Sequence, residues 1–143
     1  MSKVDVNRKI AVILVADVVG YSKHMERDEN ATLQSYSECE TILKELLDKR
    51  QGSIFNTAGD SVLAEFTSAV NAVEFAVEFQ KQITERNKSD IIPAKLEFRI
   101  GINMGDVVSR AGNLLGDGVN IAARLEALSQ PNGVSISKSI YDL

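Results

Sequence analysis

Two aspartates stand at the ends of apolar segments, where a carboxylate suits chemistry better than packing. Asp17 follows the apolar run of residues 10–16, and Asp60 lies between two segments of alternating polarity, residues 53–58 and 61–66. A Gly-Asp pair between such segments predicts a β-hairpin with a two-residue turn. If the apolar run is a central strand beside this hairpin, both carboxylates reach the same end of the sheet. Two converging carboxylates form a good oxygen site for Mg²⁺ or Mn²⁺.

The plain alternatives stay open at this point. Asp17 alone could cap the next helix, and Gly59-Asp60 alone could be only a turn. The segment after Asp17, residues 18–22, leads into a predicted helix and contains Gly20. Glycine lets the backbone approach a ligand closely, and the free N–H groups at the start of a helix suit phosphate.

A helix predicted over residues 117–128 supplies complementary groups. Asn120 and Arg124 are four residues apart, so both side chains project from one helix face. An amide and a guanidinium so placed suit a ribose and a phosphoryl oxygen, unless this is only a solvated face. The apolar stripe expected beside them consists of Ile121, Leu125 and Leu128.

The remaining patterns predict the elements that position these groups. Residues 9–16 are rich in Val and Ile and predict a central strand covered on both faces. Apolar residues at helical spacing predict a helix over 33–47 and another over 69–83, with a loop at 87–93. Further strands are predicted at 53–58, 61–66, 96–104, 106–111 and 134–137, with a turn at 112–116 and a last helix from Ser139.

The resulting order is β-α-β-β-α-β-β-α-β. Hairpins that alternate with helices favour an antiparallel or mixed sheet with helices packed on it, an α+β fold of the ferredoxin-like βαββαβ type. A length of 143 residues fits one domain.

Composition and charge restrict the kinds of molecule that the protein is expected to bind. The net charge of −4 without a basic stripe argues against nucleic acid, and a polyphosphate would need a metal ion or backbone donors to offset the charge. The longest apolar run is too short to span a membrane, and the N-terminus has no signal-peptide pattern. The single cysteine, Cys39, cannot form an internal disulfide, which favours a cytoplasmic location.

Four segments together resemble the catalytic domain of class III adenylyl/guanylyl cyclases of the bacterial type. They are ADVVGYS (16–22), NTAGDSVLAEF (56–66), FRIGINMGDVV (98–108) and LGDGVNIAARLEAL (115–128). Each segment alone is a weak signal, but four in this order and spacing are specific. The resemblance implies a catalytic domain over residues 9–143, preceded by an N-terminal extension over residues 1–8.

The resemblance also implies a role for each matching residue. Asp17 and Asp60, helped by the carbonyl group of Val18, would bind two divalent ions, Mg²⁺ or Mn²⁺. Backbone donors would cradle the phosphates, at the positions Val19, Gly20, Tyr21 and Ser22. Asn120 would orient the ribose, and Arg124 would stabilise charge on the transferring phosphoryl group.

In the family, the aspartates come from one protomer of a homodimer and the residues matching Asn120 and Arg124 from the other. The reaction would convert ATP or GTP into a 3′,5′-cyclic nucleotide and pyrophosphate in intracellular signalling. Regulatory domains would belong to a longer native protein.

The chain departs from the family pattern in two places. Adenylyl cyclases commonly read adenine with Lys at the position of Asn56 and with Asp or Thr at that of Asn113. Asparagine both donates and accepts hydrogen bonds, so these residues remain candidates for binding the base, and the family favours ATP over GTP. Family domains also continue past a helix like that at Ser139 into a closing pair of strands, so we expect a C-terminally truncated domain without them.

Two other classes of protein are alternatives. A non-catalytic cyclase-like module that binds nucleotide or only dimerises would explain the altered base-reading positions. Such a module usually loses some of the four site side chains, which are all present here. A diguanylate cyclase of related topology would carry a Gly-Gly-Asp-Glu-Phe hairpin, whereas this hairpin reads Ala-Gly-Asp-Ser.

Overall fold

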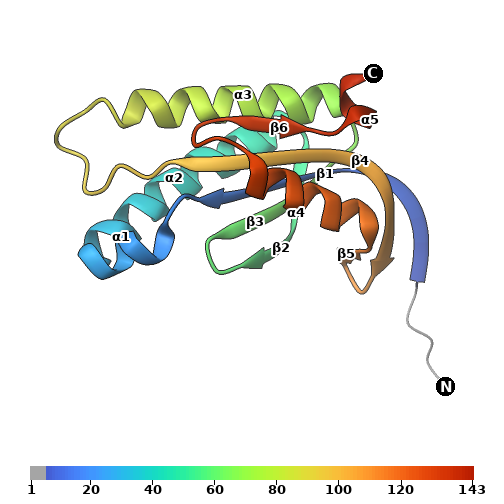
Figure 1. Cartoon of the computed structure of the whole chain (residues 1–143), viewed down its shortest axis with the longest axis horizontal. Coiled ribbons are helices and arrows are strands. Elements are labelled where there is room, and N and C mark those ends of the chain that lie inside the picture. The colour runs from blue at the N-terminus through green and yellow to red at the C-terminus, as the bar shows by residue number, and fades with distance from the viewer. Residues whose placement is uncertain (1–5) are drawn as a thin grey trace.

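A six-stranded sheet forms the centre of the computed structural model, which describes residues 6–143 (Figure 1). The strands lie in the order β2-β3-β1-β4-β5, and β6 pairs with residues 100–102 of β4, while β5 pairs with residues 108–110 of the same strand. Their bounds are β1 (Val6–Val18), β2 (Gly52–Ala58), β3 (Ser61–Phe66), β4 (Phe98–Arg110), β5 (Asn113–Leu115) and β6 (Val134–Ile136). The helices are α1 (Tyr21–Arg27), α2 (Glu29–Lys49), α3 (Ala69–Arg86), α4 (Asp117–Leu128) and α5 (Lys138–Tyr141).

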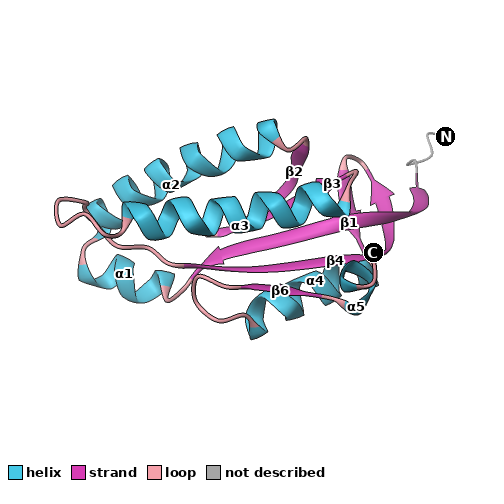
Figure 2. Cartoon of the chain, turned by 90° about the horizontal axis from the view of Figure 1, so that it is seen from above, coloured by secondary structure: helices cyan, strands magenta, loops and turns pink. Residues whose placement is uncertain are grey.

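Strand β1 is covered on both faces, as its continuous apolar run predicts. Its side chains alternate between the faces, so Val12, Leu14 and Ala16 enter one core while Ile13 and Val15 enter another. Helices α2 and α3 cover the first face and α4 covers the second (Figure 1). Figure 2 shows α2 and α3 running beside each other along the sheet.

The predicted ferredoxin-like fold is confirmed. Strands β2, β3, β1 and β4 are neighbours in that order and all antiparallel, with α2 and α3 on one face. Helix α4 is added on the opposite face, and β5 and β6 extend the sheet past β4, β6 in parallel. No helix within residues 6–143 has the length and apolar content to cross a membrane.

Two of the predicted boundaries were wrong. Strand β1 begins at Val6 rather than at residue 9, so residues 6–8 of the predicted extension belong to the sheet, and residues 1–5 lie outside the described part. The strands predicted at 96–104 and 106–111 are one continuous strand, β4, because Gly105 remains paired with Ala11 of β1. The turn predicted at 112–116 lies instead at Ala111 and Gly112, whose φ angles of 50° and 81° suit a two-residue hairpin turn, and residues 113–115 form strand β5.

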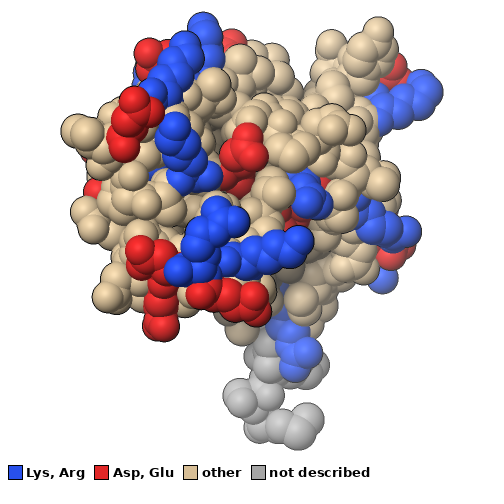
Figure 3. Space-filling view, turned by 60° about the vertical axis from the view of Figure 1, so that its left-hand side comes forward, with Lys and Arg blue, Asp and Glu red and all other residues tan. Residues whose placement is uncertain are grey.

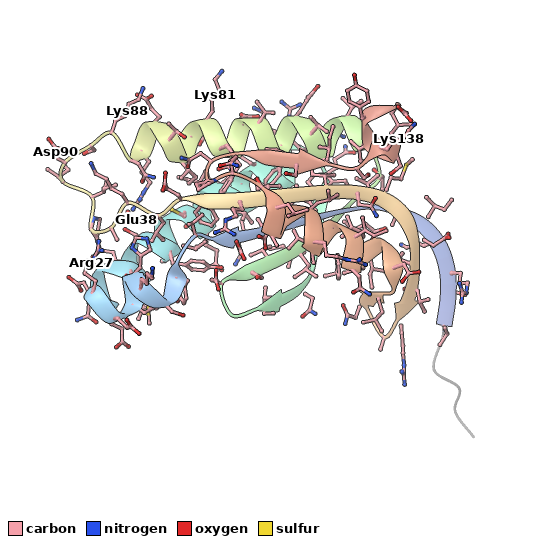
Figure 4. The ribbon with its side chains drawn as sticks, viewed as in Figure 1. Arg27, Glu38, Lys81, Lys88, Asp90 and Lys138 are labelled. Carbon is pink, nitrogen blue, oxygen red and sulfur yellow. The ribbon has the colours of Figure 1, made fainter. Side chains whose placement is uncertain are left out.

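Hydrogen bonds near both ends of the loop between α3 and β4 fix it to the rest of the fold. Arg86 donates to Glu38 Oε1 at 2.7 Å and to Ser35 Oγ at 3.0 Å, both on α2. Figure 4 labels Glu38 on the α2 side of this contact and Asp90 at the far tip of the loop. Further along, the carbonyl of Glu97 accepts the N–H of Val19 at 2.8 Å, which ties the loop to the end of β1.

Helix α4 lies very close to the sheet because two glycines make room for it. A Cβ atom on Gly101 of β4 would come within 2.3 Å of the Glu126 nitrogen and 2.4 Å of the Ala122 carbonyl oxygen. A Cβ on Gly118 of α4 would come within 2.5 Å of the Asp106 carbonyl oxygen. These contacts involve backbone atoms, which cannot rotate away as a flexible side chain can.

We therefore predict that Gly101→Ala lowers the free energy of unfolding in urea by about 3 kcal/mol, because the added methyl group pushes α4 off the sheet. The control is Gly112→Ala, where the φ of 81° strains alanine but the space is open. That variant is expected to lose about 1 kcal/mol. Equal losses in the two variants would show that close packing of α4 does not matter.

Candidate active site

Asp17 and Asp60 meet at one end of the sheet, as predicted. Strands β1 and β3 are antiparallel with Ala16 opposite Val62, which brings the β2–β3 turn beside the end of β1. Asp60 Oδ2 accepts the backbone N–H of Val18 at 2.9 Å, so the carboxylate is fixed against the residue that follows Asp17. Both aspartates are half-buried.

The turn that carries Asp60 is itself held in place. Gly59 has a φ of 60° and Asp60 is not in the left-handed region, the pattern of a type II′ hairpin turn. Tyr36 on α2 donates its hydroxyl hydrogen to the Asp60 carbonyl at 3.3 Å and packs edge-on against Tyr21. Burial, with smaller contributions from nearby acidic groups, raises the pKa of Tyr36 to about 12, so the hydroxyl remains a donor.

Two further charged residues, Glu126 and Arg99, lie beside Asp17 and form a cluster with the two aspartates. The sequence alone did not identify either of them. Glu126 lies on the buried face of α4, is 6% exposed, and its carboxyl group hydrogen-bonds to Asp17. Arg99 is the residue of β4 paired with Asp17 of β1, and its positive charge acts on both carboxyl groups. Glutamate in a helix reads as a solvent-facing residue. One signal in the sequence could have identified Glu126 as buried. It follows Val119 by seven residues and Ala122 by four, so the three share one helix face, and the other two are buried.

The carboxyl groups of Asp17, Asp60 and Glu126 lie close together, and Arg99 offsets only part of their negative charge. Burial raises the pKa of Asp17 above its ordinary value, and the negative charge of Asp60 adds to the rise. The hydrogen bond from Glu126 and the charge of Arg99 oppose it. Burial also raises the pKa of Glu126 to about 8, and the hydrogen bond to Asp17 and the Asp17 charge contribute further. Glu126 is therefore the partner that keeps the proton near neutral pH.

The donor atoms here fit a hard divalent cation. Carboxylate and carbonyl oxygens are the ligands that Mg²⁺ and Mn²⁺ prefer, and one or two carboxylates commonly suffice when phosphates supply the rest. Within residues 6–143, no three His, Cys, Asp or Glu side chains converge in a geometry suited to a metal ion. A metal at this site would thus depend on the two aspartates, the Val18 carbonyl and a bound ligand.

The turn after β1 offers fewer phosphate donors than predicted. The N–H of Val18 is used by Asp60 and that of Val19 by the Glu97 carbonyl. Gly20 caps α1 in the left-handed conformation, with a φ of 62°, and no side chain caps the helix. The backbone donors left for an anion are therefore those of Gly20, Tyr21 and Ser22.

Asn120 and Arg124 point away from the aspartates of their own chain. Both are exposed residues of α4, whereas its buried residues are Gly118, Val119, Ala122 and Glu126. With 100° per residue, Arg124 lies 200° and Asn120 about 240° around the helix from Glu126, which reaches Asp17. One chain therefore does not assemble all four predicted side chains at one place.

The apolar stripe predicted beside Asn120 and Arg124 lies on the outer face of α4, where Leu125 is half-buried. Ile121 and Leu128 are 39% and 77% exposed, and they share the outer face with Arg124. The inner face lies close to the sheet because Gly101 and Gly118 have no Cβ atom in the gap. Exposed apolar residues around a guanidinium are typical of a contact surface.

The two candidate base-reading residues lie on strands that contact each other. Asn56 is exposed on β2 and Asn113 half-buried on β5, and β2 touches β5 although they are the outermost strands in the sheet order. Each amide oxygen accepts the N–H of the next residue at 2.9 Å. The free groups of both side chains are therefore their NH₂ donors.

Two hollows of the surface lie away from these residues. One of about 450 Å³ lies between α3 and residues 132–134, and one of about 490 Å³ between α1 and residues 92–95. Neither is lined by the aspartates or by Asn120 and Arg124. Figure 3 shows Lys and Arg side chains mixed with Asp and Glu on the end of the molecule that carries α1, rather than one continuous basic stripe.

Comparison with known sequences gives one consistent answer. The profile of the family described as "Adenylate and Guanylate cyclase catalytic domain" matches residues 5–143. A "Putative adenylate cyclase 3" of Rhizobium meliloti is 43% identical over 99% of this chain and 24% of its own length. An "Adenylate cyclase" of Streptomyces coelicolor is 32% identical over 96% of this chain and 34% of its own. The chain thus spans between a quarter and about a third of these curated relatives.

Comparison with solved structures agrees. The adenylate/guanylate cyclase/hydrolase from Silicibacter pomeroyi superposes with a TM-score of 0.88 at 35% identity, over 96% of this chain and 81% of that chain. A bacterial light-regulated adenylyl cyclase superposes with a TM-score of 0.87 over 96% of this chain and 46% of that chain. At 22% identity, this second likeness supports the fold alone.

We predict that Glu126 makes the metal-free protein less stable as the pH rises. The pKa of Glu126 is about 8 in the folded protein against an ordinary value of 4.5, so folding favours the protonated form. Its stabilising contribution is complete below pH 4.5 and is lost as the pH passes through 8. The free energy of unfolding should fall by roughly 4 kcal/mol between pH 5 and pH 9.

In Glu126→Gln, this fall should be mostly absent, because the amide has no proton to lose. Urea unfolding at several pH values, with exposed Glu45→Gln as the matched control, measures the difference. An identical slope in wild type and Glu126→Gln would contradict the assignment.

Proposed function

Because the chain belongs to the family of adenylate and guanylate cyclase catalytic domains, we propose that it converts a nucleoside triphosphate into a 3′,5′-cyclic nucleotide and pyrophosphate. The observation that carries the proposal is the meeting of Asp17 and Asp60 at the end of β1, with the Asp60 carboxylate fixed by the Val18 N–H at 2.9 Å. A cytoplasmic location fits the single cysteine, Cys39, which is buried.

Asp17, Asp60 and the Val18 carbonyl would hold two divalent ions. The ions, Mg²⁺ or Mn²⁺, would lower the pKa of the ribose 3′ hydroxyl group and neutralise charge on the phosphates. The N–H groups of Gly20, Tyr21 and Ser22 would donate to phosphate oxygens, because no side chain caps the start of α1. With the triphosphate so placed, the 3′ oxygen would attack the α-phosphorus, and the bond from the α-phosphorus to the leaving pyrophosphate would break.

The remaining groups would come from a second copy of the chain. Asn120 would hold the ribose in its reactive orientation, and Arg124 would stabilise the charge that develops on the phosphoryl oxygens. Both side chains are exposed on the side of α4 turned away from Asp17 of their own chain, which supports a site shared between protomers. Ile121 and Leu128 on the same face supply apolar surface for the contact.

ATP is the preferred substrate in this proposal. The relatives in Rhizobium and Streptomyces carry the name adenylate cyclase. Asn56 and Asn113, on contacting strands, present NH₂ donors to a base edge. Neutral donors discriminate less strongly than a charged pair, so we expect a preference for ATP rather than exclusion of GTP.

We predict that Asp60→Ala and Arg124→Ala each abolish cyclic product with ATP and Mn²⁺, and that mixing the two proteins restores it. In an equal mixture, half of the dimers are mixed and each has one intact site, so about a quarter of wild-type activity should return. Cyclic product measured by chromatography provides the readout.

The matched control mixes Asp17→Ala with Asp60→Ala, which damage the same half of the site and should give no recovery. If the first mixture is as inactive as this control, the site is not shared. If the wild-type protein binds nucleotide but yields no product from ATP or GTP, the chain is a non-catalytic module of the family.

We also predict that the double variant Asn56→Lys, Asn113→Asp raises the ratio of kcat/KM for ATP over GTP by about ten-fold, because it restores a charged base-reading pair. The control is Asn30→Lys on the exposed start of α2, which should leave the ratio unchanged. An unchanged ratio in the double variant would remove these two residues from base recognition.

A further inference from the structure

Asn103 is a buried polar residue in the middle of β4 that the site described above does not use. Its side chain is 97% buried, with 3% exposed, and Nδ2 donates to the Gly118 carbonyl oxygen at 3.0 Å. Its Oδ1 accepts from the Ser139 hydroxyl at 3.4 Å. A buried amide with partners on two different helices is costly to place and must be satisfied on both sides.

The first turn of α4 has no side-chain cap of its own. Its N-cap is Gly116, and no side chain caps the free N–H groups of the helix start. Helix starts without a cap fray, because their backbone groups lack partners. Asn120 lies in this turn, and its N–H donates to the Gly116 carbonyl at 3.1 Å.

Two tertiary contacts hold this turn to the sheet. One is the bond from Asn103 to Gly118, two residues before Asn120. The other is the close approach of Gly118 to the Asp106 carbonyl, which leaves no room for a Cβ. The second contact fixes the distance between α4 and β4, whereas the hydrogen bond is directional and fixes the rotation of the turn.

Helix α5 supports Asn103 from the other side. The Ser139 hydroxyl donates to the Met104 carbonyl at 2.8 Å, besides its longer contact with Asn103. The N–H of Ser137 donates to the Ile102 carbonyl at 3.0 Å. The amide of Asn103 is thus oriented by the helix that follows β6.

We propose that Asn103 is a positioning residue for the reaction: its bond to Gly118 sets the orientation of the uncapped first turn of α4 and, through it, the Asn120 side chain. The inference rests on the proposed role of Asn120 in holding the ribose. Misplacing an orienting group by a fraction of a bond length lowers the rate of the chemical step more than it weakens substrate binding. Ser139 contributes by holding the Asn103 amide.

The test compares Asn103→Leu with Gln80→Leu. Gln80 on α3 is also a buried amide, 5% exposed, and donates to the Phe98 and Gly133 carbonyls at 2.9 Å, but it does not touch α4. Both variants lose buried hydrogen bonds, so both should lower the melting temperature. Only Asn103→Leu should lower kcat, by about ten-fold with KM within about two-fold of wild type. If Asn103→Leu does not fold, Asn103→Ala, which adds no bulk, takes its place.

The second readout is amide hydrogen exchange without nucleotide. Exchange at residues 119–122 should become about ten-fold faster in the Asn103 variant and remain unchanged in Gln80→Leu. Ser139→Ala should give a smaller acceleration there, and Lys138→Ala none, because Lys138 points to solvent from α5 with 87% of its side chain exposed (Figure 4).

The two readouts separate the two proposals. If the wild-type protein makes no cyclic nucleotide, the proposed function fails, and hydrogen exchange alone still decides whether Asn103 anchors this turn. Unchanged exchange at residues 119–122 would overturn the inference. So would equal losses of kcat in the Asn103 and Gln80 variants.

Discussion

The hydrogen bond between the Asp60 carboxylate and the Val18 N–H is the contact on which the site depends. It joins the tip of the β2–β3 hairpin to the end of β1 at 2.9 Å, in a place where the strand ladder has already ended. Without it, Asp60 would be a surface residue of a turn, and Asp17 would keep only Glu126 and Arg99 as charged neighbours. The antiparallel register and the Tyr36 hydroxyl restrict the hairpin tip further, so the two carboxylates meet despite their mutual repulsion.

Helix α4 divides the proposed chemistry between its two faces. Its inner face brings Glu126 to Asp17 across a gap that only glycine at positions 101 and 118 allows. Its outer face displays Asn120 and Arg124 to solvent, away from the aspartates of the same chain. A single helix therefore contacts one half of the site and presents the other half outward, which is the physical reason why one chain by itself is incomplete in our proposal.

Local patterns predicted much of this arrangement. Three predictions rest on residues that are adjacent in the sequence: the apolar run of β1, the Gly-Asp turn and the helical spacing of α4. The structure contains the strand, the turn and the helix. The sequence did not predict the features that depend on contacts between residues far apart in the chain. Gly105 looked like the end of a strand but stays paired with Ala11. Arg99 gave no local signal, and Glu126 gave only its helical spacing from Val119 and Ala122, since the place of both residues near Asp17 follows from the packing of α4 on β1 and β4.

The most direct test of the account is anomalous diffraction from crystals of the protein grown with Mn²⁺ and a non-hydrolysable ATP analogue. We expect manganese peaks bounded by the carboxylates of Asp17 and Asp60 and the carbonyl of Val18, with the analogue's phosphates beside Gly20 and Tyr21. Manganese bound elsewhere, or bound here without contact to both aspartates, would contradict the central claim that these two side chains form one metal site.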